Sequence, residues 1–402
     1  MIVLYYLLAT LFVGLSFVVF YTYIGYGLLA WLLVKFRGKR DVASNLSELP
    51  HVTIIVPAYN ERDYLPGKLQ NCLAQDYPAD RLHLLFVIEG STDGSAEFLA
   101  QQQVPNLRIL SGMERLGKIA AMNRAMQQVK TPITIFTDAN TQLNHEAVSR
   151  LVSRFTDGVG AVTGEKRIQV DNAESAAGSG EGFYWRYESF LKKIDAELHS
   201  IVGAAGELFA IRTDLYETVE PDTLLDDFII SLRIAGRGYR VEYAPDAYAL
   251  ERPSHSVSEE KKRKVRIAAG GFQAMKRLAY LLNVSKYGLL SFQYVSHRVL
   301  RWAVTPFCLP LLLVLNGLIL VVLQTGNTYP ATEIYWWIML LGQSIFYVAA
   351  YVGYVLENRQ TRWKLTFVPF YFVFMNWCVL LGFARFNRGN LSGVWEKSKR
   401  AA

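Results

Sequence analysis

Residues 133–140, ITIFTDAN, decide the fold prediction, because a buried strand ends there directly at an acidic and polar cluster. Two earlier segments repeat this arrangement. The run VTIIV at 52–56 is stopped by Pro57, and LLFVI at 84–88 ends at the polar run EGSTDG, residues 89–94. With helical stretches between them, these apolar runs are typical of βαβ repetition and a parallel sheet. The sequence therefore predicts an α/β domain that binds ligands beyond the carboxyl ends of its strands.

Long apolar runs flank this domain on both sides. No charged residue occurs from Ile2 to Val34, which exceeds the roughly 20 apolar residues that a helix needs to cross a bilayer. The run lacks the basic start and the small-residue cleavage site of a signal peptide. We therefore expect a transmembrane helix at residues 1–36 and about three helices within residues 303–384. The later runs, each long enough to span, are Trp302 to Leu323, Ile334 to Leu356 and Leu365 to Ala384.

Basic residues beside the apolar runs predict the orientation. The run KFRGKR, residues 35–40, closes the first apolar run, and further basic residues lie between the last two, so both flanks are expected in the cytoplasm. The loop 324–333 has no Lys or Arg and is expected outside. Three passes would then place the basic tail, residues 385–402, outside, against the rule. Either the run 365–384, interrupted by Pro369, is re-entrant or interfacial, or the tail disobeys the rule.

Composition favours a membrane partner over a nucleic acid. Hydrophobic residues make up 51% of the chain, and the net charge of +7 concentrates near the expected cytoplasmic membrane edges, where anionic lipid attracts it. The basic residues border apolar spans and form no groove interleaved with aromatic residues. The segment 283–302, with Arg298, Arg301 and Trp302, suits an amphipathic helix at the cytoplasmic interface. Three dispersed cysteines indicate neither a disulfide framework nor a zinc site. We expect a multi-pass protein of the inner (cell) membrane with its α/β domain in the cytoplasm.

Six short motifs follow one another through residues 50–282. They are VPAYNE (56–61), EGSTDG (89–94), GKIAAMN (117–123), TDAN (137–140), GAAGELFAIR (203–212) and LDDF (225–228). Together they resemble the ordered signature of family 2 glycosyltransferases. With the flanking apolar runs, the chain is similar to membrane-embedded polysaccharide synthases such as those for cellulose, hyaluronan and poly-N-acetylglucosamine. The resemblance implies a GT-A (Rossmann-like) fold, a nucleotide-sugar donor and inversion at the sugar carbon. The grouping of Asn60, Glu89, Lys118 and Asp138 around one pocket predicts that the donor is a UDP-sugar.

The resemblance implies a donor site at the strand ends. Lys118 follows Gly117 in a loop that opens a helix, a placement suited to phosphate. Glu89 stands where the family usually has an Asp that receives the uracil and ribose. Asp138 and Asn140 fall on the same side of an extended segment. Both can therefore hold a divalent cation, Mg or Mn, which prefers hard oxygen ligands. The residues expected to bind the donor are Pro57, Tyr59, Asn60, Glu61, Glu89, Lys118, Asp138, Arg263 and Arg266.

An acidic pair is expected to catalyse the transfer. Asp227 matches the catalytic base of the family's Glu-Asp pair, and Asp226 takes the place of the glutamate. A sugar hydroxyl is a poor nucleophile at neutral pH, so a carboxylate must take its proton during attack. Two adjacent acids also repel, which raises the pKa of one of them. The pair also suits the acidic first turn of a helix, and both interpretations can hold. Acceptor contacts are expected from Gly206, Glu207 and Trp185.

The basic cluster at residues 261–266 stands where processive synthases have Gln-x-x-Arg-Trp. Arg266 matches the family arginine, whereas Arg263 replaces the glutamine and Ile267 replaces the tryptophan that would stack on an acceptor sugar. The product therefore stays open between a growing polysaccharide and one or few sugars on a lipid-linked acceptor. Secretion of a polymer would require a homo-oligomer or a small membrane subunit. A non-catalytic membrane transport subunit is a third interpretation, which the acidic pair and Arg266 argue against.

Overall fold

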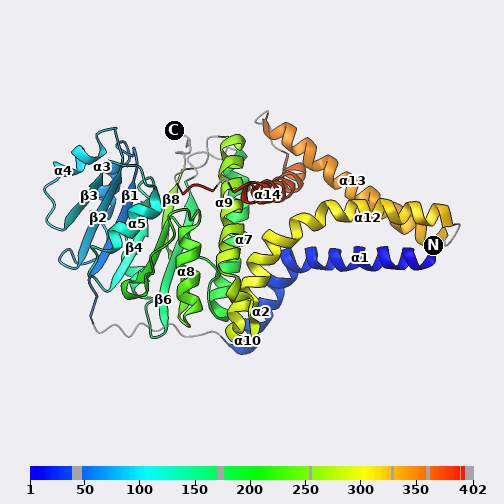
Figure 1. Cartoon of the computed structure of the whole chain (residues 1–402), viewed down its shortest axis with the longest axis horizontal. Coiled ribbons are helices and arrows are strands. Elements are labelled where there is room, and N and C mark those ends of the chain that lie inside the picture. The colour runs from blue at the N-terminus through cyan, green and yellow to red at the C-terminus, as the bar shows by residue number, and fades with distance from the viewer. Residues whose placement is uncertain are drawn as a thin grey trace.

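The computed structural model describes residues 1–38, 48–169, 176–252, 256–326, 330–358, 363–389 and 391–393. An α/β domain forms one end of the elongated molecule, and long apolar helices extend from it to form the other end (Figure 1).

One eight-stranded sheet forms the centre of the α/β domain, in the order β3-β2-β1-β4-β7-β6-β8-β5. The three strands predicted from the sequence are confirmed as β1, β2 and β4. The expected parallel arrangement is confirmed from β3 to β4 but is wrong beyond β4, because β7 runs antiparallel to both β4 and β6. The strands are β1 (Val52–Ala58), β2 (Leu82–Glu89), β3 (Leu107–Gly112), β4 (Ile133–Thr137), β5 (Gln142–Leu143), β6 (Val159–Ile168), β7 (Leu208–Arg212) and β8 (Arg240–Glu251).

Helices cover both faces of the sheet. Alternate residues of each strand face opposite sides. Val52, Ile54 and Val56 of β1 therefore pack in one apolar core with α3, α4 and α6, while Ile55 packs in a second core with α5, α8 and α9. The helices of this domain are α3 (Leu65–Leu73), α4 (Ser95–Ala100), α5 (Lys118–Met126), α6 (Ala147–Val152), α7 (Ala176–Leu198), α8 (Asp226–Gly236) and α9 (Val257–Arg277), with short 3-10 turns η2 (Thr213–Leu215) and η3 (Ala279–Leu282).

Four helical segments among the described residues are long and apolar enough to cross a membrane. The first runs without a break through α1 (Ile2–Phe20), the π-helix η1 (Tyr21–Gly25) and α2 (Tyr26–Arg37). The second runs through α11 (Leu289–Gln293), the π-helix η4 (Tyr294–Val304) and α12 (Thr305–Gly326), after the short α10 (Val284–Tyr287). The others are α13 (Pro330–Asn358) and α14 (Lys364–Asn387). The sequence-based expectation of apolar helices at both ends of the α/β domain is confirmed.

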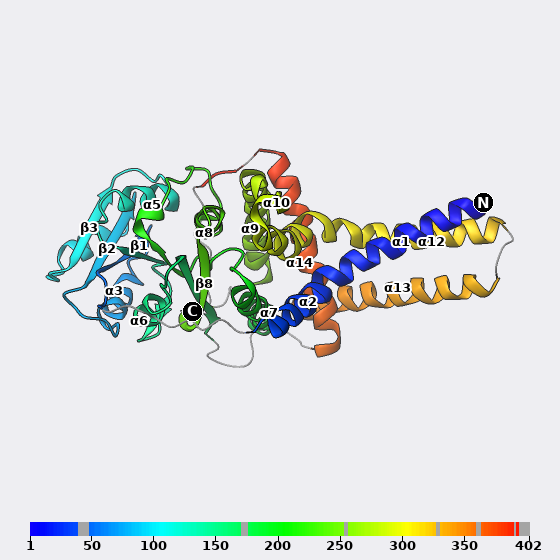
Figure 2. The ribbon, with the colours of Figure 1, turned by 90° about the horizontal axis from the view of Figure 1, so that it is seen from below.

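The helix α14 differs in direction from the other three segments. α1, α12 and α13 extend away from the α/β domain, whereas α14 runs across them beside α9 (Figures 1 and 2). Its first half packs Phe367 and Tyr371 in a cluster with Val257 and Val265 of α9, and its second half brings Phe383 against Phe272. The last apolar run therefore lies along a helix of the α/β domain over most of its length.

In the segment expected to be an interfacial helix, residues 283–302, two basic residues contact the α/β domain. Arg298 and Arg301 belong to η4 and are buried, each forming an ion pair with Glu188 of α7. These two charges therefore hold the segment to the α/β domain, whereas a membrane surface was their expected partner. Whether residues 283–302 lie at a membrane interface stays a prediction.

Candidate active site

Two adjoining pockets lie at the carboxyl ends of the strands. We call the first the strand-end pocket; it is lined by the ends of β1, β2 and β4, by the start of α5 and by Glu251. The second, which we call the helix-side pocket, is lined by the segment before β7, by the start of α8 and by residues of α7, α9 and η4. Lys118 and Asp138 line both pockets and so form their common wall.

Most residues expected at the donor site line the strand-end pocket. They are Pro57, Tyr59, Glu61, Glu89, Lys118 and Asp138, together with the expected metal ligand Asn140. Arg263 and Arg266 line the helix-side pocket instead. The residues of the strand-end pocket lie together because parallel strands end at one edge of the sheet. The polar groups that follow these strands therefore lie at the same edge.

Asn60, between the pocket-lining residues Tyr59 and Glu61, connects two loops by hydrogen bonds. It has a positive φ of 52°, a left-handed conformation that asparagine tolerates. Its Oδ1 accepts a hydrogen bond of 2.9 Å from the Thr92 backbone, and its own N–H donates to Ser91 Oγ at 3.0 Å. Asp93 accepts a hydrogen bond from the backbone of Ser95, the first residue of α4, while Gly94 is the N-cap of this helix. Asn60 therefore connects the loop after β1 to the loop after β2. Donor contact by this residue stays a prediction.

Two arginines that the sequence interpretation missed contact residues that line the strand-end pocket. Arg124 of α5 forms a 2.7 Å ion pair with Glu89 at the end of β2, and Arg115 lies 4.0 Å over the ring of Tyr59. Burial raises the pKa of the Glu89 carboxyl although the Arg124 guanidinium opposes this effect. Arg115 stands two residues before the GKIAAMN motif, and Arg124 directly follows it. Their proximity to this motif is the sequence feature that could have identified them.

Lys118 is the electrostatic link between the pockets. Its Nζ lies 2.8 Å from Asp138 Oδ1 and 3.3 Å from Asp226 Oδ2. Burial disfavours the charged ammonium, but the carboxylates of Asp138 and Asp226 outweigh this and hold the pKa of Lys118 above its ordinary value. Burial also raises the pKa of Asp138, against the attraction of Lys118. The lysine therefore stays charged and holds both acids in place.

Asp227 has the properties of a proton acceptor near neutral pH. Burial, assisted by the charge of neighbouring Asp226 and opposed by Lys118, raises the pKa of Asp227 to about 7. Gly206 lies directly against this carboxyl group, because a Cβ added there would come within 3.2 Å of Asp227 Oδ2. The acidic pair is also the first turn of α8, so both interpretations of these residues are compatible with the structure.

Ion pairs hold the far wall of the helix-side pocket. Lys166 pairs with Glu207 at 2.5 Å and with Glu251, and Arg263 lies 3.6 Å from Glu251. Burial opposes ionisation of Glu207, but Lys166 dominates and lowers its pKa to about 2. Burial lowers the pKa of Arg266 to about 10. Arg263 also pairs with Glu260 at 3.1 Å, so much of its charge is already compensated inside the protein.

The remaining acceptor predictions have mixed outcomes in the structure. Gly206 and Glu207 line the helix-side pocket beside Asp227. The Trp185 side chain lies outside the residues that the structure describes. Trp302 and Arg298, which the sequence pattern assigned to a membrane interface, line the same pocket. They were missed as site residues because nothing in their local sequence connects them to a domain that ends before residue 283.

The donor set beside Lys118 fits a divalent cation. Asp138 and Asn140 line one pocket and offer a carboxylate and an amide oxygen, which are hard ligands of the kind Mg and Mn prefer. Within the described ranges, no group of three or more His, Cys, Asp or Glu side chains could hold a metal ion by itself. Mg is commonly held by one or two carboxylates together with substrate phosphates, so a small protein donor set agrees with this chemistry.

Comparison with known proteins identifies related chains and folds. The model of the family described as "Glycosyl transferase family 2" matches residues 53–219. Glycosyltransferase AglE of Haloferax volcanii is 30% identical over 236 residues, which cover 56% of this chain and 75% of AglE. The poly-beta-1,6-N-acetyl-D-glucosamine synthase of Staphylococcus aureus is 26% identical over 249 residues, 60% of this chain. The match spans only 58% of the synthase.

A solved structure shares the fold over nearly the whole chain. It is the mannosyltransferase PcManGT from Pyrobaculum calidifontis in complex with GDP-Man and Mn2+, with a TM-score of 0.71 and 22% sequence identity. The superposition covers 94% of this chain and 99% of that one. The predicted fold class, an α/β GT-A domain flanked by apolar helices, is thereby confirmed.

Proposed function

Because the chain belongs to glycosyl transferase family 2, we propose that it transfers a sugar from a UDP-sugar to a growing polysaccharide, with inversion at the sugar carbon. The observation that carries this proposal is the position of Asp227. A carboxyl group with a pKa of about 7 lies in the helix-side pocket, next to the wall of Lys118 and Asp138 that this pocket shares with the strand-end pocket. A donor in one pocket and an acceptor in the other would meet at this wall.

The proposed donor occupies the strand-end pocket. Tyr59 with its stacked Arg115 offers a flat surface for a base, and Glu89 offers a carboxylate to base or ribose. Lys118 and Arg266 supply positive charge for the diphosphate. Asp138 and Asn140 would hold a divalent cation, which when bound neutralises charge on the departing diphosphate. The Mn2+ in the complex of the mannosyltransferase supports this cofactor.

The proposed reaction is a single displacement. The acceptor hydroxyl oxygen forms a bond to the anomeric carbon of the donor sugar, and its proton passes to the Asp227 carboxylate. The bond from that carbon to the diphosphate oxygen breaks, and its electron pair leaves with the nucleoside diphosphate. Asp226 acts by raising the pKa of Asp227 and by holding Lys118. Gly206 leaves space for the substrate hydroxyl because it adds no side chain beside the base.

A calorimetric titration tests the donor. UDP, GDP and CDP are titrated into the full-length protein with Mn2+ and, separately, with EDTA. We expect UDP to bind most tightly and EDTA to weaken binding strongly. A preference for GDP or CDP would contradict the nature of the donor, and binding that is indifferent to EDTA would contradict the cation.

The proposed location is the inner membrane, with the α/β domain on the cytoplasmic side. Support comes from the four apolar helical segments and from the basic residues that flank them. The partners are the nucleotide-sugar donor, a glycan or lipid-linked acceptor and the lipid bilayer, and no nucleic acid is expected. Transport of a long product would require a homo-oligomer or a small membrane subunit in addition.

A second candidate is the addition of one or few sugars to a lipid-linked acceptor. The observation that favours it is the direction of α14, because a helix lying along α9 leaves fewer segments to surround a channel. Liposomes containing the purified protein, with donor supplied on the side of the α/β domain, separate the two candidates. Long polymer delivered across or protected by the bilayer supports synthesis of a polysaccharide, and a chloroform-soluble product with one or two sugars supports the second candidate.

A further inference from the structure

Trp302 and Phe228 are the two large aromatic residues that line the helix-side pocket, together with the acidic pair. On the α9 side the same pocket is lined by Ile267, which is aliphatic. Half of the residues that line the pocket are charged, among them Lys166 and Glu207. A half-buried indole close to charged groups is the combination that a sugar ring requires, because its C–H face is apolar while its hydroxyls form hydrogen bonds.

Contacts from three elements fix the indole in place. The Phe228 ring, next in the chain to Asp227, packs at 5.4 Å from the Trp302 ring. On α9, the absence of a side chain at Gly271 makes room for the indole, since a Cβ there would lie 2.5 Å from Trp302 Cε3. Arg298, one turn earlier on η4, lies 5.7 Å over the ring. The ring orientation is therefore set before any ligand binds.

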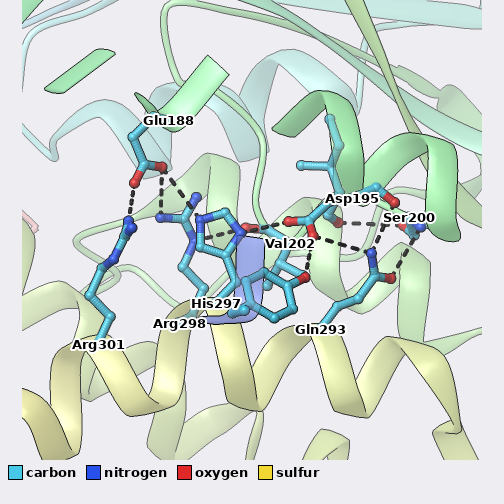
Figure 3. Close-up of polar contacts among 10 residues, drawn as sticks. Glu188, Asp195, Ser200, Val202, Gln293, His297, Arg298 and Arg301 are labelled. Atoms are coloured by element: carbon cyan, nitrogen blue, oxygen red, sulfur yellow. Dashed lines mark hydrogen bonds and ion pairs between the residues drawn. The ribbon is translucent and has the colours of Figure 1, made fainter. Parts of the chain in front are cut away.

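A buried polar network anchors the helix that carries Trp302. Glu188 of α7 lies between Arg298 and Arg301 and pairs with both (Figure 3). Farther along the same interface, Asp195 contacts His297 at 2.6 Å and accepts from Gln293 (Figure 3). Because η4 is held at both ends of this interface, Trp302 cannot move independently of the α/β domain.

The charges around Trp302 favour a neutral ligand group. Arg298 donates to Glu188 at 3.1 Å and to the Val202 carbonyl at 3.0 Å, and Arg301 pairs with the same glutamate. The positive charges of these two buried arginines are thus partly compensated by Glu188, and the indole beside them offers a flat apolar surface. A bare phosphate would gain less here than a sugar ring that stacks on it.

We infer that Trp302 is the platform on which a pyranose ring of the acceptor stacks, so the acceptor presents a sugar rather than a terminal phosphate to Asp227. This inference rests on the proposed function and specifies the substrate class of its second site. The reacting hydroxyl of that ring loses its proton to Asp227 as its oxygen bonds to the donor sugar, and the nucleoside diphosphate leaves with the electron pair.

Initial rates with a defined acceptor test the platform. The full-length protein is purified in a detergent without sugar, because alkyl glycoside detergents would compete for the site. Radiolabelled UDP-sugars and GDP-mannose are the donors, and octyl β-D-glucopyranoside below its micelle concentration is the acceptor probe. We expect Trp302→Ala to raise KM for octyl glucoside about 10-fold, with KM for the donor nearly unchanged, since stacking and apolar contact are lost.

Matched variants separate stacking from folding. Trp302→Phe retains an aromatic face and is expected to stay within about threefold of wild type. Ile267→Trp in the Trp302→Ala background supplies an indole from the α9 side of the same pocket and is expected to recover part of the affinity. Trp377→Leu, on the exposed side of α14, is the control for loss of a tryptophan elsewhere. An unchanged acceptor KM in Trp302→Ala, or an equal loss in Trp302→Phe, would overturn the inference.

The failure of the inference and that of the proposed function are distinguishable. Transfer from a nucleotide sugar to decyl phosphate, with none to octyl glucoside, overturns the platform and leaves the family activity intact. If no sugar leaves any donor, the proposed function fails. In that case, saturation-transfer NMR of octyl glucoside still decides the platform, since loss of ring-proton contacts in Trp302→Ala supports it and unchanged contacts overturn it.

Discussion

At the residue scale, one lysine and three acids set the chemistry of the site. Lys118 neutralises Asp138 and Asp226, while Asp227 receives less of this attraction and is left with a raised pKa. The motifs identified these four residues because they stand at strand ends and helix starts. The separation of their roles depends on distances of a few ångströms, which no local sequence specifies.

Replacement of Asp227 by asparagine is expected to abolish transfer. The carboxamide keeps the shape of the side chain but cannot take the proton, and loss of a general base typically costs about 100- to 10,000-fold. The measurement is the single-turnover rate with saturating donor, and nucleotide binding by calorimetry should stay nearly intact. An inactive Asp226→Asn beside an active Asp227→Asn would reverse the assignment of the two acids.

The transfer rate is expected to fall in acid. Because the pKa of Asp227 is raised to about 7, the proton-accepting form predominates above pH 7 and is lost as the pH decreases below it. The rate at saturating donor should therefore decrease about tenfold per pH unit below about pH 6.5 and level off above about pH 7.5. A rate that persists unchanged to pH 5 would show that another group accepts the proton.

At the element scale, the interface of α2, α7 and η4 joins the apolar helices to the α/β domain. Asp195 of α7 is fully buried and receives hydrogen bonds from Tyr26, Gln293 and His297. Sequence patterns predicted the helices on either side of this interface. They did not predict the partners, because residues 26, 195 and 297 are far apart in the chain and meet only when three helices pack.

Loss of Asp195 is expected to destabilise the whole chain. Asp195→Leu leaves Tyr26 and His297 without their acceptor, whereas Gln293 keeps its hydrogen bond to the backbone carbonyl of residue 195. Breaking a buried charged network by removing one partner costs about 3–5 kcal/mol. The apparent midpoint of thermal unfolding in detergent should drop accordingly. Tyr26→Phe removes a single donor and is the graded control, with an expected cost of about 1 kcal/mol. Equal midpoints for wild type and Asp195→Leu would contradict a structural role for this network.

At the scale of the whole molecule, the direction of α14 bears on the orientation conflict in the sequence. The helix lies along α9, and Gly393, shortly after its end, lies against Pro221 and lines the helix-side pocket. The beginning of the tail is therefore on the side of the α/β domain. This agrees with the interfacial alternative for residues 365–384 and with the basic character of the tail.

Site-directed labelling checks this topology. Ala402→Cys at the tail and Ser91→Cys in the loop after β2 should react with an impermeant maleimide from the same side of sealed vesicles, and Thr325→Cys from the other side. The native Cys72, Cys308 and Cys378 are buried, so the background should be low. Labelling of Ala402→Cys together with Thr325→Cys would show that α14 crosses the membrane.

The sequence by itself determined the α/β class, the strands β1, β2 and β4, the apolar helical segments and the motif residues of the strand-end pocket. Each of these depends on local periodicity, strand-stopping residues or run length, which are readable over a few neighbours. The tertiary structure decided the reversal of β7, the partners of Arg298 and Arg301, the position of α14 and the presence of Trp302 beside Asp227. These depend on contacts between segments that are far apart in the chain, whose energies come from packing and burial that no single segment contains.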